Sequence, residues 1–191
     1  MARWHFEPGH TAAEFRARHM MVSWVRGFFK NISGELEFDP VAPERGWVKV
    51  SIDARTLWTG ESNRDAHLKS ADFLDAERFP TIDFRSTQVK PVGGHELAVT
   101  GDLKIRGVTK PVTLHVHYLG QWKCPWWEDG VDKGPVVRAG FLARTTINRH
   151  DFGVSWNAPL ERGGVVVGDQ VRITLDAEAI LDSTDPRQRQ T

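Results

Sequence analysis

The sequence lacks several features that would assign it to a function class. Its 191 residues contain a single cysteine, Cys124, which excludes an internal disulfide and a thiolate metal cluster. Lys plus Arg and Asp plus Glu both number 25, so the chain has no basic surplus of the kind that nucleic-acid-binding proteins carry. No apolar run approaches the roughly 18 residues that a membrane-spanning helix needs. We therefore expect no nucleic-acid partner and no stable membrane insertion.

The first eight residues also lack the apolar core of a signal peptide, because charge interrupts them from Arg3 onward. We therefore expect a reduced, cytoplasmic protein. A chain of this length suits one folded domain, which we predict over residues 1–181, followed by a polar, disordered tail over residues 182–191. Eight Trp, ten Phe and one Tyr supply ample aromatic surface for one core.

Apolar and polar residues alternate with period two through most of the chain. The alternation is clearest at residues 48–52, 82–84, 97–105, 112–118 and 171–179, and weaker at 13–17, 28–38 and 139–147. It places one face of each strand in an apolar interior and the other in water, as in antiparallel sheets. Strands this long favour one closed sheet, which leaves no exposed edges, over a sandwich. The sequence thus predicts an all-β fold of eight antiparallel strands closed into a barrel.

Two stretches interrupt the alternation. Ser62 and Asp65 have the spacing of a capping box, which predicts a short helix over the residues that follow, 66–71. In residues 18–26, Met20 lies four positions before Trp24, and this spacing predicts a second short amphipathic helix. Its adaptable methionines would let such a helix gate access to the barrel interior.

The inward positions mix bulky residues with very small ones, such as Ala17, Gly34 and Gly101. This pattern is consistent with a hollow, apolar lumen and also with a solid core in which small residues fit a taper. If the barrel is hollow, the predicted lining residues are Phe15, Met20, Trp24, Phe28, Ile32, Leu36, Phe38, Val50, Leu68, Phe73, Phe84, Val99, Leu103, Leu114, Phe141, Ile147, Phe152 and Ile173.

Catalytic signatures are missing: no nucleophile elbow, dinucleotide fingerprint, P-loop or His-Glu-x-x-His motif occurs. We therefore predict no enzyme, no cofactor and no metal. His115 and His117 share the outward face of a strand without a third ligand, so we expect a solvated pair. An enzyme acting on a hydrophobic substrate would need a polar group in the lumen, and Lys30 is the clear candidate at inward parity.

The segment 121–130 combines charge with three tryptophans, Trp122, Trp126 and Trp127. We expect a long hairpin whose tryptophans fold back over the barrel end. If they are exposed instead, they form a lid or a patch that binds a partner.

The segment 148–153 is the densest polar cluster at a strand end. Arg149 and Asp151 could pair with each other and fix the turn at Gly153. Alternatively, Arg149 could lie at the barrel mouth, where its planar fork of donors would suit a phosphate or carbonyl head group, with Asp151 beside it.

Eight segments, taken in order along the chain, match one family pattern. They are residues 4–11, 15–19, 25–29, 33–36, 63–75, 78–86, 101–114 and 148–153. The chain thereby resembles the YceI-like family of polyisoprenoid-binding, lipocalin-like bacterial proteins. The resemblance implies an extended eight-stranded antiparallel barrel with a lipid-sized tunnel, and so favours the hollow interior. Many relatives are exported, and residues 121–130 are not part of the family pattern.

The resemblance also implies a function. We expect the chain to bind and to sequester or carry a long isoprenoid, such as a prenyl quinone or a polyprenyl pyrophosphate. Each buried CH₂ contributes about 0.8 kcal/mol, so a long chain binds without specific polar contacts. The alternatives are a carrier of another amphiphile, such as a fatty amide, and a protein-interaction module that uses the tryptophan segment. A homodimer is the default expectation for a soluble oligomer.

Overall fold

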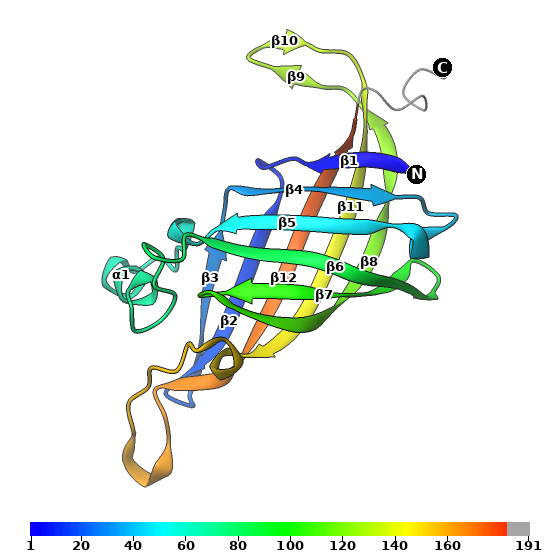
Figure 1. Cartoon of the computed structure of the whole chain (residues 1–191). Coiled ribbons are helices and arrows are strands. Elements are labelled where there is room, and N and C mark those ends of the chain that lie inside the picture. The colour runs from blue at the N-terminus through cyan, green and yellow to red at the C-terminus, as the bar shows by residue number, and fades with distance from the viewer. Residues whose placement is uncertain (183–191) are drawn as a thin grey trace.

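The computed structural model describes residues 1–182, and most of them form strands (Figure 1). The strands that form the barrel are β1 (Ala2–Phe6), β4 (Ile32–Phe38), β5 (Trp47–Asp53), β6 (Thr81–Gly93), β7 (Glu96–Ile105), β8 (Val108–Cys124), β11 (Val136–Asn148) and β12 (Val167–Leu181). They pair antiparallel in the order β1-β4-β5-β6-β7-β8-β11-β12, and β12 pairs back to β1. The predicted all-β fold, a closed eight-stranded antiparallel barrel, is confirmed.

Two more strands, β2 (Ala12–His19) and β3 (Ser23–Phe29), extend the sheet from the seam of the barrel. The seam forms where β12 changes partner along its length. Residues 179–181 of β12 pair with β1, whereas residues 167–176 pair with β2. Between these two stretches the Glu178 carbonyl accepts the Glu7 N–H at 2.9 Å and the Thr11 hydroxyl at 3.3 Å. Strand β12 therefore joins the closed barrel to the β2–β3 hairpin.

Several small inward residues make room for aromatic rings. A Cβ at Gly101 would lie 2.6 Å from the Phe84 ring, and one at Gly34 would lie 2.9 Å from the Phe6 ring. At Gly27 the Phe15 ring comes within 2.4 Å of the same position. Beside these glycines the aromatic rings therefore fill the interior, as expected for a solid, tapered core. The cavities of the barrel are bounded by other residues.

The helix predicted over residues 18–26 is wrong. These residues end β2, make a turn at Met20–Val22 and begin β3. The prediction failed because a short apolar run fits helical and hairpin spacing equally well, and Val167, the partner of His19 on β12, is distant in sequence. The strand predicted over residues 28–38 is divided between β3 and β4 by a turn at Lys30 and Asn31, where Asn31 has a φ of 55°.

The other predicted helix is present as α1 (Ser62–Lys69), the one α-helix among residues 1–182. Its N-cap is Glu61, whose carboxylate accepts the N–H groups of Asn63 at 3.0 Å and Arg64 at 2.6 Å. The cap therefore lies one residue before the predicted capping box. Neither α1 nor any other described helix has the length and apolar character needed to cross a bilayer.

The tryptophan segment forms a hairpin of its own, β9 (Trp127–Glu128) and β10 (Val131–Asp132), which pair only with each other. The hairpin projects beyond the end of the barrel (Figure 1). Trp122 is 66% exposed and Trp127 is 63% exposed. The expectation that the tryptophans fold back over the barrel end is therefore wrong for these two, whereas Trp126 is half-buried. The tail predicted at the C-terminus lies, from residue 183 onward, outside the described residues.

Candidate ligand-binding site

The main cavity of the barrel has a volume of about 190 Å³ and is walled almost entirely by apolar side chains. Predicted lining residues that border it are Phe15, Val50, Leu68, Phe73, Phe84, Leu103, Leu114, Ile147, Phe152 and Ile173. Lining residues that the sequence did not single out include Ala13, Phe29, Ile52, Leu57, Leu74, Ile82, Ile105, Val154, Val167, Val171 and Leu175. Most of these lie on the same strand faces, so strict parity would have found them.

A second cavity of about 100 Å³ lies further along the barrel interior. Predicted lining residues that border it are Leu36, Phe38, Val99 and Phe141. Four residues, Val50, Phe84, Leu114 and Leu175, border both cavities. We call these four the dividing ring, because they form the wall that the two cavities share.

Four predicted lining residues lie away from both cavities. Met20 and Trp24 are exposed on the β2–β3 hairpin, and Phe28 packs outward against Trp58 with the ring centroids 6.4 Å apart. Ile32 is buried in the core, outside the cavity walls. The turn at residues 30–31 interrupts the alternation, so the inward positions counted from β4 do not continue into β3. Phe29 therefore faces inward in place of Phe28.

Lys30 lies in the same turn, where its side chain is exposed and its N–H donates to the Thr56 hydroxyl at 3.1 Å. It therefore supplies no polar group to the lumen. Among the polar residues that border the main cavity, Asp83 accepts hydrogen bonds from Ser51 at 2.7 Å and from Thr81 at 2.9 Å. The carboxylate is thus already satisfied by its neighbours.

Arg149 borders the main cavity and is only 4% exposed. Its Nε donates to the Gly168 carbonyl at 3.0 Å, and Nη1 donates to the carbonyls of Val154 at 2.7 Å and Trp156 at 2.9 Å. Nη2 donates to the Val167 carbonyl at 3.1 Å. Burial lowers the pKa of Arg149, and the Asp169 carboxylate opposes this effect.

The guanidinium therefore ties the loop after β11 to the start of β12. Its carboxylate neighbour, at 4.0 Å, is Asp169 and not the predicted partner Asp151. A head-group role for Arg149 and Asp151 stays a prediction, and at most one N–H of the guanidinium is left for it.

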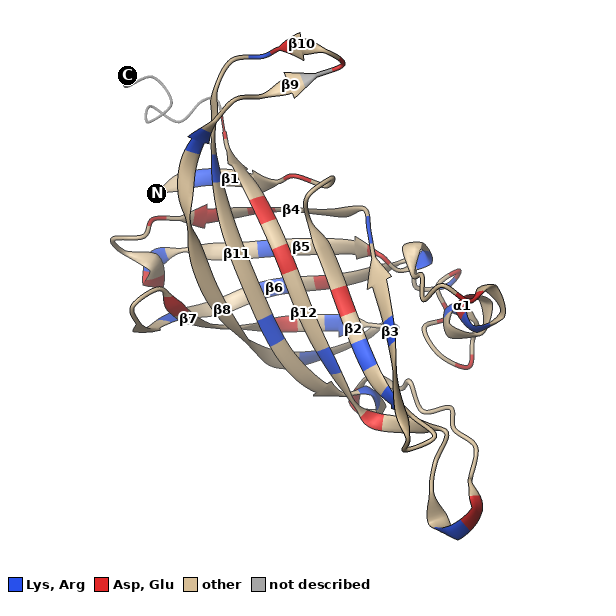
Figure 2. Ribbon diagram, turned by 180° about the vertical axis from the view of Figure 1, so that it is seen from behind, with Lys and Arg blue, Asp and Glu red and all other residues tan. Residues whose placement is uncertain are grey.

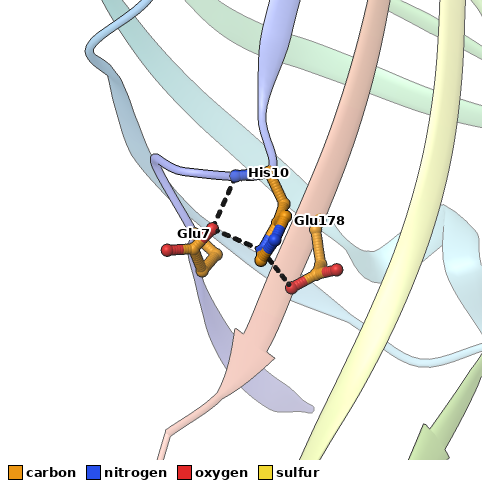
Figure 3. Close-up of side chains that lie close together, drawn as sticks. All are labelled: Glu7, His10 and Glu178. Atoms are coloured by element: carbon orange, nitrogen blue, oxygen red, sulfur yellow. Dashed lines mark hydrogen bonds and ion pairs between the residues drawn. The ribbon is translucent and has the colours of Figure 1, made fainter. Parts of the chain in front are cut away.

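Glu7, His10 and Glu178 form a polar cluster at the seam (Figure 3). The His10 Nδ1 lies 2.9 Å from a Glu7 carboxylate oxygen and 3.5 Å from Glu178 Oε1. These residue types can bind a metal, but Arg138 already forms an ion pair with the same Glu178 oxygen. A cation placed there would face the guanidinium charge, so we interpret the cluster as an ion network that closes the seam.

The remaining polar candidates face solvent. His117 Nδ1 lies 2.6 Å from Glu96 on the outer surface, and His115 is exposed beside it on β8. Both imidazoles therefore lie on the outward face of β8, and His117 has Glu96 as a partner.

Comparison with known proteins gives the same fold. The YceI-like domain pattern matches residues 4–179. A UPF0312 protein of Pseudomonas putida (strain F1) is 38% identical over 148 residues, which cover 78% of this chain and 73% of that protein. A UPF0312 protein of Pseudomonas fluorescens (strain SBW25) is 37% identical over 153 residues, covering 80% and 76%.

Solved structures agree. BcnA of Burkholderia cenocepacia superimposes with a TM-score of 0.76 at 22% identity, covering 91% of this chain and 98% of that one. The YceI protein of Campylobacter jejuni gives 0.70 at 25% identity, covering 87% and 90%. A polyisoprenoid binding domain from Saccharophagus degradans gives 0.66 at 12% identity, covering 95% and 100%. With a family pattern that spans nearly its whole length and relatives of this similarity, the chain belongs to the YceI-like family.

Proposed function

We propose that the barrel binds a long-chain isoprenoid, such as a prenyl quinone or a polyprenyl pyrophosphate, and carries or sequesters it. The observation that carries this proposal is the pair of apolar cavities on the two sides of the dividing ring. Interiors of folded proteins are normally filled to crystal-like density, so apolar space of this kind in a barrel is suited to an apolar guest. The polyisoprenoid binding domain of Saccharophagus degradans has the same fold.

The binding energy would come from burial of the hydrocarbon. At about 0.8 kcal/mol for each CH₂, one isoprene unit of five carbons contributes several kcal/mol without any hydrogen bond. Because Asp83 and Arg149 are already engaged with protein groups, the head group gains little from entering the cavity. We therefore infer that the tail occupies the interior and that the head group stays at the mouth.

Native mass spectrometry of the purified protein, followed by denaturation and organic extraction, tests the proposal. We expect a co-purifying compound whose mass varies in prenyl steps. A fatty amide or another amphiphile in the extract would replace the isoprenoid as the ligand. A clean apo mass, with no uptake of added prenyl lipids, would contradict binding altogether.

A variant pair locates the ligand. Phe84→Glu places a carboxylate in the dividing ring, where it would lie against the hydrocarbon, so lipid retention should fall at least ten-fold. Gln88→Glu adds the same charge to an exposed position on β6 and should leave retention unchanged. Full retention in a folded Phe84→Glu variant would overturn the proposed location.

Two further variants serve if Phe84→Glu does not fold. Leu114→Trp fills the dividing ring without adding charge, so the protein should retain shorter prenyl chains than the wild type does. Phe141→Glu affects only the smaller cavity and should exclude the longest chains first. An unchanged chain-length distribution in both variants would overturn the proposed path through the ring.

Binding of a protein partner is the second candidate function, favoured by the exposed side chains of Trp122 near the end of β8 and Trp127 in the β9–β10 hairpin. Exposed aromatic clusters are typical of interaction sites. A variant without the hairpin would then lose the association and keep its lipid. Loss of lipid on removal of the hairpin would instead make it part of the carrier.

A further inference from the structure

The turn between β2 and β3 carries methionines in a backbone conformation that does not favour them. Met20 and Met21 have φ angles of 46° and 60°, and the Val22 N–H donates to the His19 carbonyl at 3.1 Å. Positive φ at both central positions is the geometry of type I′ turns, which strongly favour Asn and Gly. Turn stability therefore does not account for the two methionines.

The same residues form an exposed apolar tip, which we define as Met20, Met21, Val22 and Trp24. Val22 is 82% exposed, and the two methionines are 44% and 46% exposed. The tip lies at the lower end of β2 and β3, away from the β9–β10 hairpin (Figure 1). An apolar tip in this position is available to an external partner.

Basic residues lie directly beside the tip. Arg16 on β2 is opposite Arg26 on β3 and opposite Arg172 on β12, which places three arginines in a row across the sheet. We call this the arginine row. Like charges directly opposite one another destabilise a sheet. Within residues 1–182 no ion pair neutralises any of the three, so the row accumulates positive charge.

Trp24 connects the apolar tip to the arginine row. The guanidinium carbons of Arg16, Arg18 and Arg172 lie 5.6, 5.2 and 4.8 Å from its ring centroid. Cation–π contacts of this kind hold the guanidinium groups around the ring and leave the N–H donors of Arg16 and Arg172 available. Arg18 Nη2 donates to the Met21 carbonyl at 3.1 Å. The tip and the row therefore form one continuous surface.

The charge on this face is distributed unevenly along the strands. On β12, Asp169 and Arg172 lie on the half that begins beside the tip, whereas Asp176 and Glu178 lie on the half that leads to β1. Figure 2 shows the blue and red bands along this strand. A groove of about 640 Å³ beside the row is lined by Lys110, Arg144 and further polar side chains, with Asp151 as its carboxylate. Basic residues thus outnumber acidic ones in this groove and in the arginine row.

We propose that the apolar tip and the arginine row form a docking surface for an anionic phospholipid bilayer. The arginines would bind lipid phosphates, Trp24 would lie at the interface, and the methionines with Val22 would enter the boundary between head groups and acyl chains. A soluble anion or a nucleic acid would use the arginines but would leave Val22 and the strained methionines without a role. A bilayer uses both parts of the surface.

Flotation with phosphatidylglycerol–phosphatidylcholine vesicles, and with vesicles of phosphatidylcholine alone, tests this surface. We expect binding to the anionic vesicles only, weakened by added salt. Arg16→Gln with Arg172→Gln should lower the partition coefficient about 25-fold, because each basic residue contributes roughly five-fold. The matched control is Lys90→Gln with Lys104→Gln, which removes two exposed charges from β6 and β7 and should bind like the wild type.

The decisive variant is Met20→Asn with Met21→Gly. It installs residues that a type I′ turn favours, so it should fold at least as well as the wild type, yet binding should fall about ten-fold or more. The matched control, Val92→Asn, removes an exposed apolar side chain from β6 and should bind normally.

Three results would overturn the proposal. They are equal binding to both vesicle types, equal loss in the two double charge variants, and full binding by Met20→Asn with Met21→Gly. The last result would identify a site for soluble anions. Vesicle binding is measured without added isoprenoid, so its failure would leave the proposed cavity ligand untouched, and an empty cavity would leave the docking surface untouched.

Discussion

Replacement of Arg149 by methionine tests whether this residue is a structural clamp. Methionine keeps much of the unbranched apolar stem but removes all the N–H donors. The carbonyls of Gly168 and Val154, both in buried hydrogen bonds, would then lose their partner. Each unsatisfied buried carbonyl costs about 1–3 kcal/mol, which gives about 2–6 kcal/mol for the pair. The free energy of unfolding of a domain is typically about 5–15 kcal/mol, so a loss of about 6 kcal/mol could exceed the whole stability of a marginal domain.

Urea unfolding measures this loss directly. With a slope of about 2 kcal/mol per molar urea, the midpoint of Arg149→Met should fall by about 1–3 M. Arg149→Lys keeps a charge and up to three donors but loses the planar fork, so its midpoint should lie between the two. Arg162→Met, at an exposed arginine of the same loop region, is the control and should leave the midpoint within about 0.5 M of the wild type.

The clamp interpretation is refuted if Arg149→Met unfolds at the same urea concentration as the wild type. If that stable variant also loses its lipid, Arg149 acts on the ligand head group. A variant that is less stable but still folded, and retains its lipid at low temperature, supports the clamp alone. A structural clamp therefore changes the urea midpoint, whereas a head-group ligand changes lipid retention.

Three further predictions concern the barrel wall and its end. Tyr118 is the single tyrosine, and burial raises its pKa. Its contribution to stability should therefore be full below about pH 10 and should be lost as the pH rises through the folded-state pKa. A titration of tyrosinate absorbance with the same midpoint in the folded and the urea-unfolded chain would contradict this. Gly34→Ala should lower the free energy of unfolding by about 3 kcal/mol or more, because its Cβ would lie 2.2 Å from the Lys49 carbonyl oxygen. Gly140→Ala should lower it less, because its Cβ meets only a side chain at 3.3 Å. Equal urea midpoints for the two variants would refute the steric argument. An Asn-Gly turn in place of residues 125–135 should leave the urea midpoint unchanged, because the flanking residues are already directly paired, and a lower midpoint would show that the hairpin supports the barrel.

Period-two alternation was sufficient to predict the barrel wherever a strand is regular. It identified the inward faces of β7, β8 and β12, and with them Leu103, Leu114 and Ile173 of the cavity wall. It failed at Lys30 and Asn31, where a turn resets the parity, and it therefore assigned Phe28 to the lumen in place of Phe29. The Asn in that turn was the available signal.

Other features depend on contacts between residues distant in sequence. Whether Gly101 borders open space or an aromatic ring depends on Phe84 of the neighbouring strand, and no local pattern carries that information. The acceptors of Arg149 are backbone carbonyls of residues 154–168, which any sequence supplies. The helix predicted at residues 18–26 failed for a different reason, since pairing of β2 with β3 across the turn outweighs local helical spacing.

The seam sets the order in which the chain can fold. Because β1 pairs with β12, Trp4 lies opposite Leu181, and Ala2 near the start of the chain is completely buried. During synthesis the barrel therefore stays open, with an unpaired edge on β1 and its apolar lining accessible, until β12 has left the ribosome. Contacts this far apart in sequence make folding slow, on the scale of milliseconds to seconds. The nascent chain thus passes through a period in which a chaperone or an apolar ligand can reach the interior from the side.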